Sequence, residues 1–261
     1  MDLEAYLDRI GFTGAVSSSL PCLRALHRHH VLAVPFEDLD VHLGREIALD
    51  LPRIYAKVVR DRRGGFCYEL NALFHWLLTE IGFAAELVSA RIYGEGTYGP
   101  PFDHMSIVVR VGGGWLADVG YGDLFLEPLR LDSAVVQTDR FKDYRVERTP
   151  AGAFALRESL RDADVFVDRY VVDPRSRSLG DFAVQCAEKQ TSPRSYFVRN
   201  LVCTLPTPSG RKTLMNTTFK TRTDGRVVQT EIADETHLAT LLRDEFDIRV
   251  DLGDLRRAAL W

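Results

Sequence analysis

Cysteine is scarce in this chain, and no two cysteines have the spacing of a metal site. Four occur among 261 residues, at positions 22, 67, 186 and 203, without a CxxC pair or zinc-finger spacing. We therefore expect no bound metal, thiols that stay reduced, and a cytoplasmic location.

Excess positive charge and long apolar runs are also missing. The net charge of −4 gives no basic field for nucleic acid. No apolar run approaches the roughly 18–20 residues of a membrane span. The N-terminal stretch MDLEAYLDRIGF is acidic and amphipathic, so we expect no signal peptide. With 46% hydrophobic and 27% charged residues, the composition is that of a globular protein of one or two domains.

The periodicity of apolar residues changes twice along the chain. Apolar spacing, Ser19, Asp50 and Gly82 predict helices at 3–10, after 19, after 50 and at 66–81. Later helices are predicted at 181–189, 234–246 and 252–260. Strands are predicted at 85–93, 105–111, 114–119, 144–147, 154–158, 165–172, 201–205, 212–216, 218–223 and 226–231. The Gly-Gly-Gly run at 112–114 indicates a hairpin turn, and the order of elements indicates an α+β fold.

The stretch RRGGFCYELN at 62–71 places Cys67 at the start of a helix, behind two glycines. Unpaired N–H groups and the positive end of the helix dipole favour the thiolate there, which is the nucleophilic form. We expect Gly64 and Gly65 to leave room for a substrate. A thiolate nucleophile also needs a base, and that base needs an acceptor to orient it.

Among seven histidines, His104 is the best candidate for the base. His27, His29 and His30 are predicted to lie on a solvated helix face or to cap a helix dipole, and His75 is too far along the helix of Cys67. His104 follows a loop rich in glycine and proline and opens a strand.

Asp118 lies in the next strand among apolar residues. If residues 112–114 form the turn, antiparallel pairing brings Asp118 back beside His104. A carboxylate in apolar surroundings needs a partner, and an imidazole N–H supplies one. The pattern predicts a triad of Cys67, His104 and Asp118.

Together with RRGGFCYELN and the position of His104, the motifs VPFEDLD at 34–40 and ADVGYG at 117–122 resemble those of arylamine N-acetyltransferases. The resemblance implies a helical domain (1–83), an antiparallel β-barrel (84–190) and an α/β lid (191–261), with a cysteine-protease-like core. It also implies a cytoplasmic enzyme of xenobiotic metabolism that moves an acetyl group from acetyl-CoA through Cys67 to an arylamine, hydrazine or N-hydroxyarylamine. A homodimer is compatible with it. One departure is Asp38, where the family often has Asn.

Other residues are assigned supporting roles. Arg63 and Glu37 are predicted to form a buried ion pair that braces the cysteine loop. The phosphates of CoA need cations, which Lys189, Arg194, Arg199, Arg211 and Lys212 could supply, although each also suits a solvated surface. A slot for an aromatic amine is predicted from Phe36, Phe66, Gly122, Phe125, Phe197 and Phe219, although several of these aromatics also suit an ordinary core.

Three other functions are compatible with these residues. The first is a thiol protease, hydrolase or transglutaminase with the same triad order; the short distance from Cys67 to His104 counts against a papain-like protease. The second is an amide synthase that cyclises a thioester-bound acyl chain to a macrolactam. The third is a CoA- or xenobiotic-binding scaffold without activity, which the intact triad disfavours.

Overall fold

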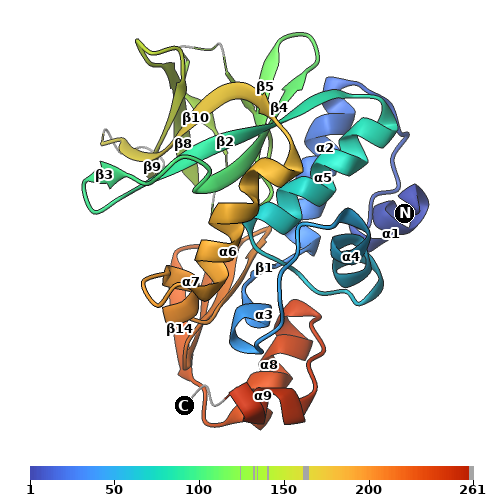
Figure 1. Ribbon diagram of the computed structural model, residues 1–261, viewed down its shortest axis with the longest axis vertical. Helices are drawn as coiled ribbons and strands as arrows, with labels where there is room; N and C mark the ends of the chain where they lie inside the picture. The colour runs from blue at the N-terminus through green and yellow to red at the C-terminus, as the bar shows by residue number, and fades with distance from the viewer. Residues whose placement is uncertain (124, 132, 134, 140, 161–164, 259–261) are drawn as a thin grey trace.

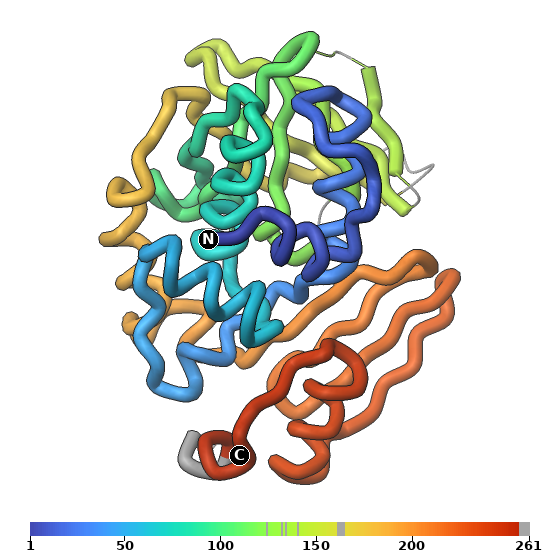
Figure 2. The backbone as a smooth tube through the Cα atoms, turned by 90° about the vertical axis from the view of Figure 1, so that its right-hand side faces the viewer, coloured from blue at the N-terminus to red at the C-terminus, as the bar shows by residue number. Residues whose placement is uncertain are grey.

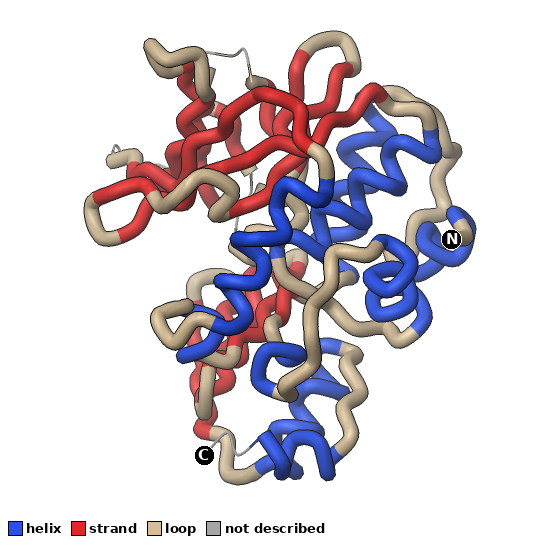
Figure 3. The backbone as a smooth tube through the Cα atoms, viewed as in Figure 1, coloured by secondary structure: helices blue, strands red, loops and turns tan. Residues whose placement is uncertain are grey.

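The computed structural model of this protein describes residues 1–258, except 124, 132, 134, 140 and 161–164. Helices α2 (Leu20–Ala33) and α5 (Cys67–Ile81) lie along one side of a curved sheet (Figure 1). The view turned by 90° shows a second sheet beneath them, with helix α8 (Glu235–Phe246) against it (Figure 2). Colouring by secondary structure separates the helices from the two sheets (Figure 3).

The N-terminal helices begin and end where their sequence signals indicate. The Ser19 hydroxyl accepts the Cys22 N–H and caps α2, with Pro21 in the first turn. Asp50 caps the next predicted helix in the same way, and Gly82 ends α5 in the left-handed conformation with φ 97°. The other segments of this part are α1 (Leu3–Arg9), β1 (Phe36–Glu37), α3 (Leu39–His42), α4 (Leu51–Tyr55) and η1 (Ala56–Arg60).

The sequence patterns missed β1 and α3, and they did not indicate that the helix after Asp50 ends in the π-helical turn η1. β1 is two residues long and pairs with β11 (Val202–Thr207), far along the chain, so it carries no local signal. η1 is one turn of π-helix that continues α4, and the Asp61 N–H binds the Ala56 carbonyl five residues back. Such a turn inserts one extra residue into a helix and often accompanies a functional site.

The first sheet is antiparallel and nearly closed. Within the described residues its strands run in the order β6-β5-β4-β2-β10-β9-β8-β7, with β3 paired to β2. Edge strands β6 and β7 meet through the Gln137 side chain, which accepts the Arg130 N–H at 2.6 Å and donates to the Arg130 carbonyl at 2.9 Å. The predicted α+β fold with an antiparallel barrel is confirmed. The strands are β2 (Ala84–Gly94), β3 (Thr97–Tyr98), β4 (His104–Arg110), β5 (Gly114–Ala117), β6 (Leu129–Arg130), β7 (Gln137–Thr138), β8 (Lys142–Arg148), β9 (Phe154–Leu160) and β10 (Val167–Arg177).

The glycine run between β4 and β5 forms the predicted hairpin turn. Gly112 and Gly113 have φ values of 58° and 134°, which glycine adopts without strain. The turn pairs Ile107 with Ala117, and this register decides which residues after β5 lie beside His104.

The second sheet joins the N-terminal part of the chain to the C-terminal part. Its order is β1-β11-β12-β13-β14, so the strand that carries Phe36 and Glu37 forms one edge. The predicted helix 252–260 begins at Leu252, and its residues 259 and 260 lie outside the described residues. The remaining elements are η2 (Leu179–Phe182), α6 (Ala183–Thr191), α7 (Tyr196–Arg199), β12 (Gly210–Met215), β13 (Thr218–Thr223), β14 (Arg226–Glu231) and α9 (Leu252–Ala258).

Hydrophobic residues gather in three places among the described residues. The largest cluster joins the N-terminal helices to the face of the first sheet that α5 covers. A second fills the inside of the barrel, and a third lies between the second sheet and α8. The division at residues 83 and 190 stays a prediction, and no described helix is long and apolar enough to cross a membrane.

Arg9 is a buried cation that ties the segment before Cys67 to the helices. Its Nε donates to the Val58 carbonyl at 2.9 Å, and Nη1 donates to the Ala33 carbonyl at 2.9 Å. Nη2 lies 3.3 and 3.4 Å from the carbonyls of Arg62 and Arg63. Burial lowers the pKa of Arg9 to about 10, which still leaves it charged at neutral pH.

Replacing Arg9 with Met is expected to lower the free energy of unfolding by about 3 kcal/mol, because buried carbonyl groups lose a charged donor. Urea unfolding followed by circular dichroism measures this change. Arg53, which is exposed on α4, is the control, and Arg53→Met is expected to change stability by less than about 0.5 kcal/mol. Equal destabilisation by the two substitutions would contradict the role given to Arg9.

Candidate active site

Cys67 is the first residue of α5, and the two glycines before it are packed against other groups. A Cβ on Gly64 would lie 2.0 Å from the Pro35 carbonyl oxygen, and one on Gly65 would lie 2.8 Å from Glu69 Oε2. The expectation that these glycines leave room for a substrate is wrong. They are required because protein atoms approach the backbone closely, which fixes the loop that presents Cys67.

His104 and Asp118 lie side by side inside the barrel. His104 begins β4, and Asp118 follows β5 by one residue. Extending the register of Ile107 with Ala117 sets Asp118 opposite Ser106, two residues from His104 on the same face. His104 Nε2 is 2.6 Å from Asp118 Oδ2, and both side chains are buried. The two side chains are neighbours, as the hairpin pattern predicts.

The remaining nitrogen of His104 is directed to Cys67. Burial lowers the pKa of His104, but the Asp118 carboxylate and a hydrogen bond to Cys67 raise it, so that the result is about 10. Since Nε2 is bound to Asp118, Nδ1 is the nitrogen left for the thiol. Burial raises the pKa of Asp118, but His104 and other donors lower it below its ordinary value. The arrangement therefore favours a charged imidazolium next to a carboxylate and a sulfur nucleophile.

Asp118 is held by several donors besides His104. Its Oδ2 accepts the Tyr170 hydroxyl at 2.9 Å and the Ser106 hydroxyl at 3.2 Å. Its Oδ1 accepts Asn71 Nδ2 at 2.9 Å and the Gly120 N–H at 3.0 Å. Sequence reasoning missed Ser106, Asn71 and Tyr170. Asn71 carried a usable signal, because it stands four residues after Cys67 and so lies on the same face of α5.

His27 is part of this site, and its predicted place on a solvated face is wrong. The ring is fully buried, Nε2 accepts the Asp118 N–H at 3.1 Å, and Nδ1 lies 2.9 Å from the Leu126 carbonyl. Burial lowers the pKa of His27 to about 4, so the ring is neutral with its proton on Nδ1. His30 is also buried and bonds the Tyr6 hydroxyl, whereas His29 is half-buried beside the Ile10 carbonyl.

A recess beside Asp118 brings together three of the residues predicted to bind a substrate. They are Phe36, Gly122 and Phe125, and the other lining residues are Val31, Val34, Asp118, Val119, Tyr121, Thr204, Pro206 and Arg211. Phe125 stacks on His27, with ring centroids 5.6 Å apart. Gly122 has φ 92°, and a Cβ there would come within 3.2 Å of the Phe36 ring.

The other three predicted aromatics lie in two different places. Phe197 contacts the rings of Phe36 and Phe66, at centroid distances of 6.0 and 5.9 Å. Phe66 is fully buried in the core, and neither Phe66 nor Phe197 is among the lining residues of the recess. Phe219 lies in the core of the second sheet, 6.1 Å from the Phe246 ring of α8. The structure therefore does not bring Phe219 to the recess.

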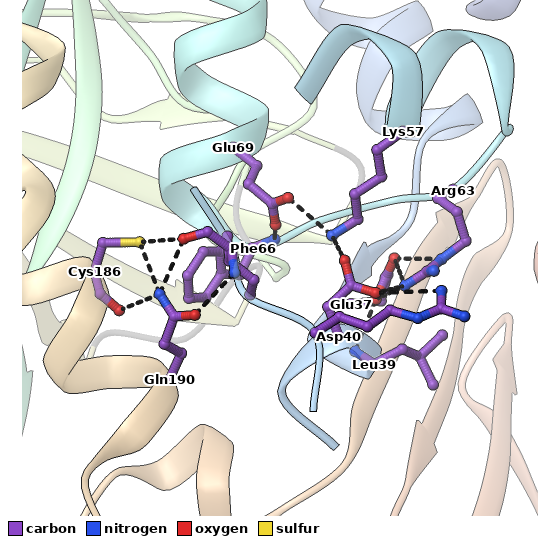
Figure 4. A network of polar contacts seen from close by, with 11 residues as sticks. Glu37, Leu39, Asp40, Lys57, Arg63, Phe66, Glu69, Cys186 and Gln190 are labelled. Carbon is purple, nitrogen blue, oxygen red and sulfur yellow. Dashed lines mark hydrogen bonds and ion pairs between the residues drawn. The ribbon is translucent and has the colours of Figure 1, made fainter. Parts of the chain in front are cut away.

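Arg63 and Glu37 form the ion pair that the sequence predicted. Arg63 Nε and Nη2 donate to Glu37 Oε1 and Oε2 at 3.0 and 3.1 Å, and Nη2 also reaches Asp40 Oδ1 at 3.0 Å. Lys57 and Glu69, which the sequence did not indicate, extend the cluster (Figure 4). These buried charges lie under the N-terminus of α5 and support the loop before Cys67.

Asp38, the departure from the family motif, follows β1 and binds β11, the neighbouring strand of the same sheet. Its Oδ1 accepts the Val202 N–H at 2.8 Å, and its side chain is buried. Burial raises the pKa of Asp38 well above its ordinary value, although the Val202 N–H lowers it. Asp38 therefore supports the position of β1 and takes no part in the contacts of His104.

Most of the cations considered for CoA are engaged in ion pairs. Lys189 pairs with Asp103, Lys212 with Glu245, and Arg211 with Asp123. Arg194 and Arg199 are exposed. Across the described residues, no group of three His, Cys, Asp or Glu side chains is placed to hold a metal ion.

Comparisons with known proteins agree along nearly the whole chain. A family model described as N-acetyltransferase matches residues 19–255. The arylamine N-acetyltransferase of Escherichia coli (strain K12) is 33% identical over 265 residues, covering 95% of this chain and 89% of that protein. The structure resembles the arylamine N-acetyltransferase from Salmonella typhimurium (TM-score 0.90, 29% identity, 98% of this chain and 97% of that chain). It also resembles the Mycobacterium marinum arylamine N-acetyltransferase in complex with CoA (TM-score 0.89, 28% identity, 98% of each chain).

Cys67 is expected to react with iodoacetamide at least about tenfold faster than the other three cysteines, because only its thiol has a helix N-terminus and an imidazole beside it. Burial raises the pKa of Cys186 to about 12 and that of Cys203 well above its ordinary value. Peptide mapping after substoichiometric labelling measures the distribution. Equal labelling of Cys22, Cys67, Cys186 and Cys203 would remove Cys67 from the site.

Asp118→Asn is expected to lower the pKa of His104 from about 10 to below the ordinary value near 6.5, because burial then outweighs the remaining contacts. Imidazole nitrogen shifts in histidine-labelled protein follow the titration. The pair contributes fully to stability between the ordinary pKa of an aspartate, about 3.9, and about pH 6.5. Its contribution is lost as pH rises toward 10, where His104 loses its proton, and also as pH falls through the lowered pKa of Asp118. An unchanged His104 titration in Asp118→Asn would contradict the coupling.

Proposed function

Because this chain belongs to the arylamine N-acetyltransferase family, we propose that it transfers the acetyl group of acetyl-CoA to an arylamine, hydrazine or N-hydroxyarylamine through an acetyl-Cys67 intermediate. Membership rests on the family match over residues 19–255 and on the similarity to the E. coli enzyme. It confirms the family resemblance that the motifs around Cys67 and Asp118 indicated. The protein is thus an acyltransferase, and the acceptor and the two-step course are the proposal.

The observation that carries the proposal is the contact of His104 with both Asp118 and Cys67. In the first half-reaction the Cys67 thiolate attacks the thioester carbonyl of acetyl-CoA, and the C–S bond to CoA breaks. The proton held by His104 passes to the departing CoA thiolate. Exchange between two thioesters is nearly balanced in energy, so a good thiolate is the main requirement.

In the second half-reaction an amine attacks the acetyl-Cys67 carbonyl. His104 removes a proton from the amine nitrogen as the new C–N bond forms, and the Cys67 thiolate leaves. General acid–base help of this kind is worth about 10²–10⁴-fold in rate. Asp118 holds the ring orientation and stabilises its charged form, and the Cys67 N–H at the helix N-terminus is the oxyanion donor we propose.

The recess beside Asp118 has a volume of about 20 Å³, room for about one water molecule, so we propose that its walls move apart to admit a flat aromatic acceptor. Phe36, Phe125 and Val119 give it apolar walls, and Tyr121 adds an aromatic ring that lies 5.6 Å from the His104 ring. Apolar walls with a few polar groups are the usual composition of small-molecule sites. Asp118 lines this recess, whereas Cys67 and His104 are not among its lining residues.

Acetyl-CoA is the proposed acetyl donor, because the Mycobacterium marinum relative is described in complex with CoA. Arg194 and Arg199 are exposed, and among the described residues neither forms an ion pair with a carboxylate; Arg199 donates to the Ser195 carbonyl. These two cations are therefore the candidates for binding the phosphates of CoA. The relatives named above are acetyltransferases, so the amide-synthase and transglutaminase alternatives gain no support. Cytoplasmic location, a part in xenobiotic metabolism and a homodimer stay predictions.

Mixing the protein with acetyl-CoA alone is expected to add one acetyl group to Cys67, because the first half-reaction needs no amine. Intact mass spectrometry detects the adduct, and an added arylamine is expected to remove it. Initial rates are then expected to give parallel double-reciprocal lines at several fixed acetyl-CoA concentrations, the pattern of ping-pong exchange.

Two variants complete the test of this mechanism. Cys67→Ala is expected to abolish both half-reactions, and Asp118→Asn to reduce turnover by a factor on the order of 10⁴, by analogy with the serine triad. Intersecting lines together with substantial activity in Cys67→Ala would mean direct transfer in a ternary complex.

A further inference from the structure

Lys57 is a buried lysine between two carboxylates, directly under the N-terminus of α5. Its Nζ lies 2.8 Å from Glu69 Oε1 and 2.8 Å from Asp40 Oδ2, and its side chain is 14% exposed. Figure 4 shows Lys57 reaching from its helix to both carboxylates, with Arg63 on the far side of Asp40. A lysine is buried at this depth only when its charge is compensated.

Glu69 connects Lys57 to the residue before Cys67. The second oxygen of its carboxylate accepts the Phe66 N–H at 3.2 Å, and its side chain is 4% exposed. The same carboxylate fills the space next to Gly65, where a Cβ would lie 2.8 Å from Oε2. The carboxylate thus fixes the chain at the two positions that precede Cys67.

The backbone of Lys57 holds the same loop at a second point. Its carbonyl accepts the Arg63 N–H at 3.0 Å. This carbonyl belongs to η1, the π-helical turn, whereas the side chain of Lys57 is directed to Glu69. One residue therefore contacts the loop at its start and, through Glu69, at its end.

The charge balance of the cluster depends on Lys57. Three carboxylates (Glu37, Asp40, Glu69) face two largely buried cations, Lys57 and Arg63. A third cation, the exposed Arg45, lies 3.9 Å from Asp40. The Cys186 thiol of α6 also lies within electrostatic reach of Glu69. Burial raises the pKa of Glu69, Lys57 lowers it, and Glu37 and Asp40 raise it further. Without Lys57, the pKa of Glu69 would rise further, because an unpaired buried carboxylate is costly.

We propose that Lys57 is a positioning residue for the Cys67 nucleophile, acting by holding the Glu69 carboxylate against the N–H of Phe66. The proposal rests on the function proposed above for Cys67. A protonated carboxyl group is a weaker acceptor than a carboxylate. Loss of Lys57 therefore loosens the start of α5 at neutral pH, and the effect is reversed when Glu69 ionises at higher pH.

The test compares the reactivity of Cys67 in the whole protein across pH 6 to 9.5, with iodoacetamide and with acetyl-CoA as separate reagents. The measured quantity is the rate constant of Lys57→Met divided by that of the wild type at the same pH. This ratio is expected to be about one tenth at pH 7 and to approach one as pH rises, because the effect depends on protonation of Glu69. Lys57→Met/Glu69→Gln keeps an acceptor for the Phe66 N–H that does not titrate. Its ratio is expected to be independent of pH and within about threefold of one.

Lys142→Met is the matched control. Lys142 is also buried between carboxylates, those of Glu158 and Asp123, and its loss is expected to leave the pH profile of Cys67 with the wild-type shape. A flat ratio in Lys57→Met, or the same pH dependence in the double variant, would overturn the proposal, because the effect would then be general destabilisation. Failure of the acetyl-CoA reaction in the wild type, with the iodoacetamide profile as described, would overturn the acetyl-transfer function alone.

Discussion

The buried carboxylate of Asp118 is the interaction on which the arrangement of the site depends. A charge taken out of water must be compensated by donors supplied by the protein. Here the donors come from β4, β10, α5 and the turn after β5, through His104, Tyr170, Asn71 and Gly120. They meet only when α5 lies in one position along the barrel. The same condition sets Cys67 beside His104.

Helix α5 carries contacts to two separate clusters of buried charge. Asn71 joins Asp118 inside the barrel, and Glu69 joins Lys57 and the carboxylates below the helix. Cys67 precedes Glu69 and Asn71 on this helix. The two clusters therefore fix both the position of Cys67 along the helix axis and its direction around that axis. One cluster contains the His104 imidazole, and the other contains the ion pairs of Lys57 and Arg63. The cluster around Asp118 thus brings an imidazole to the start of α5, and the cluster around Lys57 holds the start of α5 in place.

Local signals in the sequence predicted the elements and the core of the site. Ser19, Asp50 and Gly82 marked helix ends, and the glycine run gave the hairpin whose register brings Asp118 to His104. These features depend on residues within a few positions of each other. The place of Cys67 at the start of a helix is likewise a local signal.

What the sequence could not show are contacts between distant segments. His27 reaches Asp118 across 91 residues and Tyr170 across 52, and neither belongs to a motif. A histidine on an amphipathic helix gives the same pattern whether its face meets solvent or a neighbouring strand. The sequence also could not show that Phe219 lies away from the recess. Alternation in a strand shows that one face is buried, but it does not show which element covers that face.

The recess beside Asp118 is lined by residues from the N-terminal and the C-terminal parts of the chain, and this limits how its shape can change. Phe36 enters it from β1, and Arg211 enters from β12 of the same sheet. Arg211 donates to the Gly122 carbonyl and pairs with Asp123 at 3.0 Å, so it ties that sheet to the turn after Asp118. A change in the walls of the recess must therefore keep this tie. Asp118 and Tyr121 also line the recess, so a change in its shape acts directly on groups that contact His104.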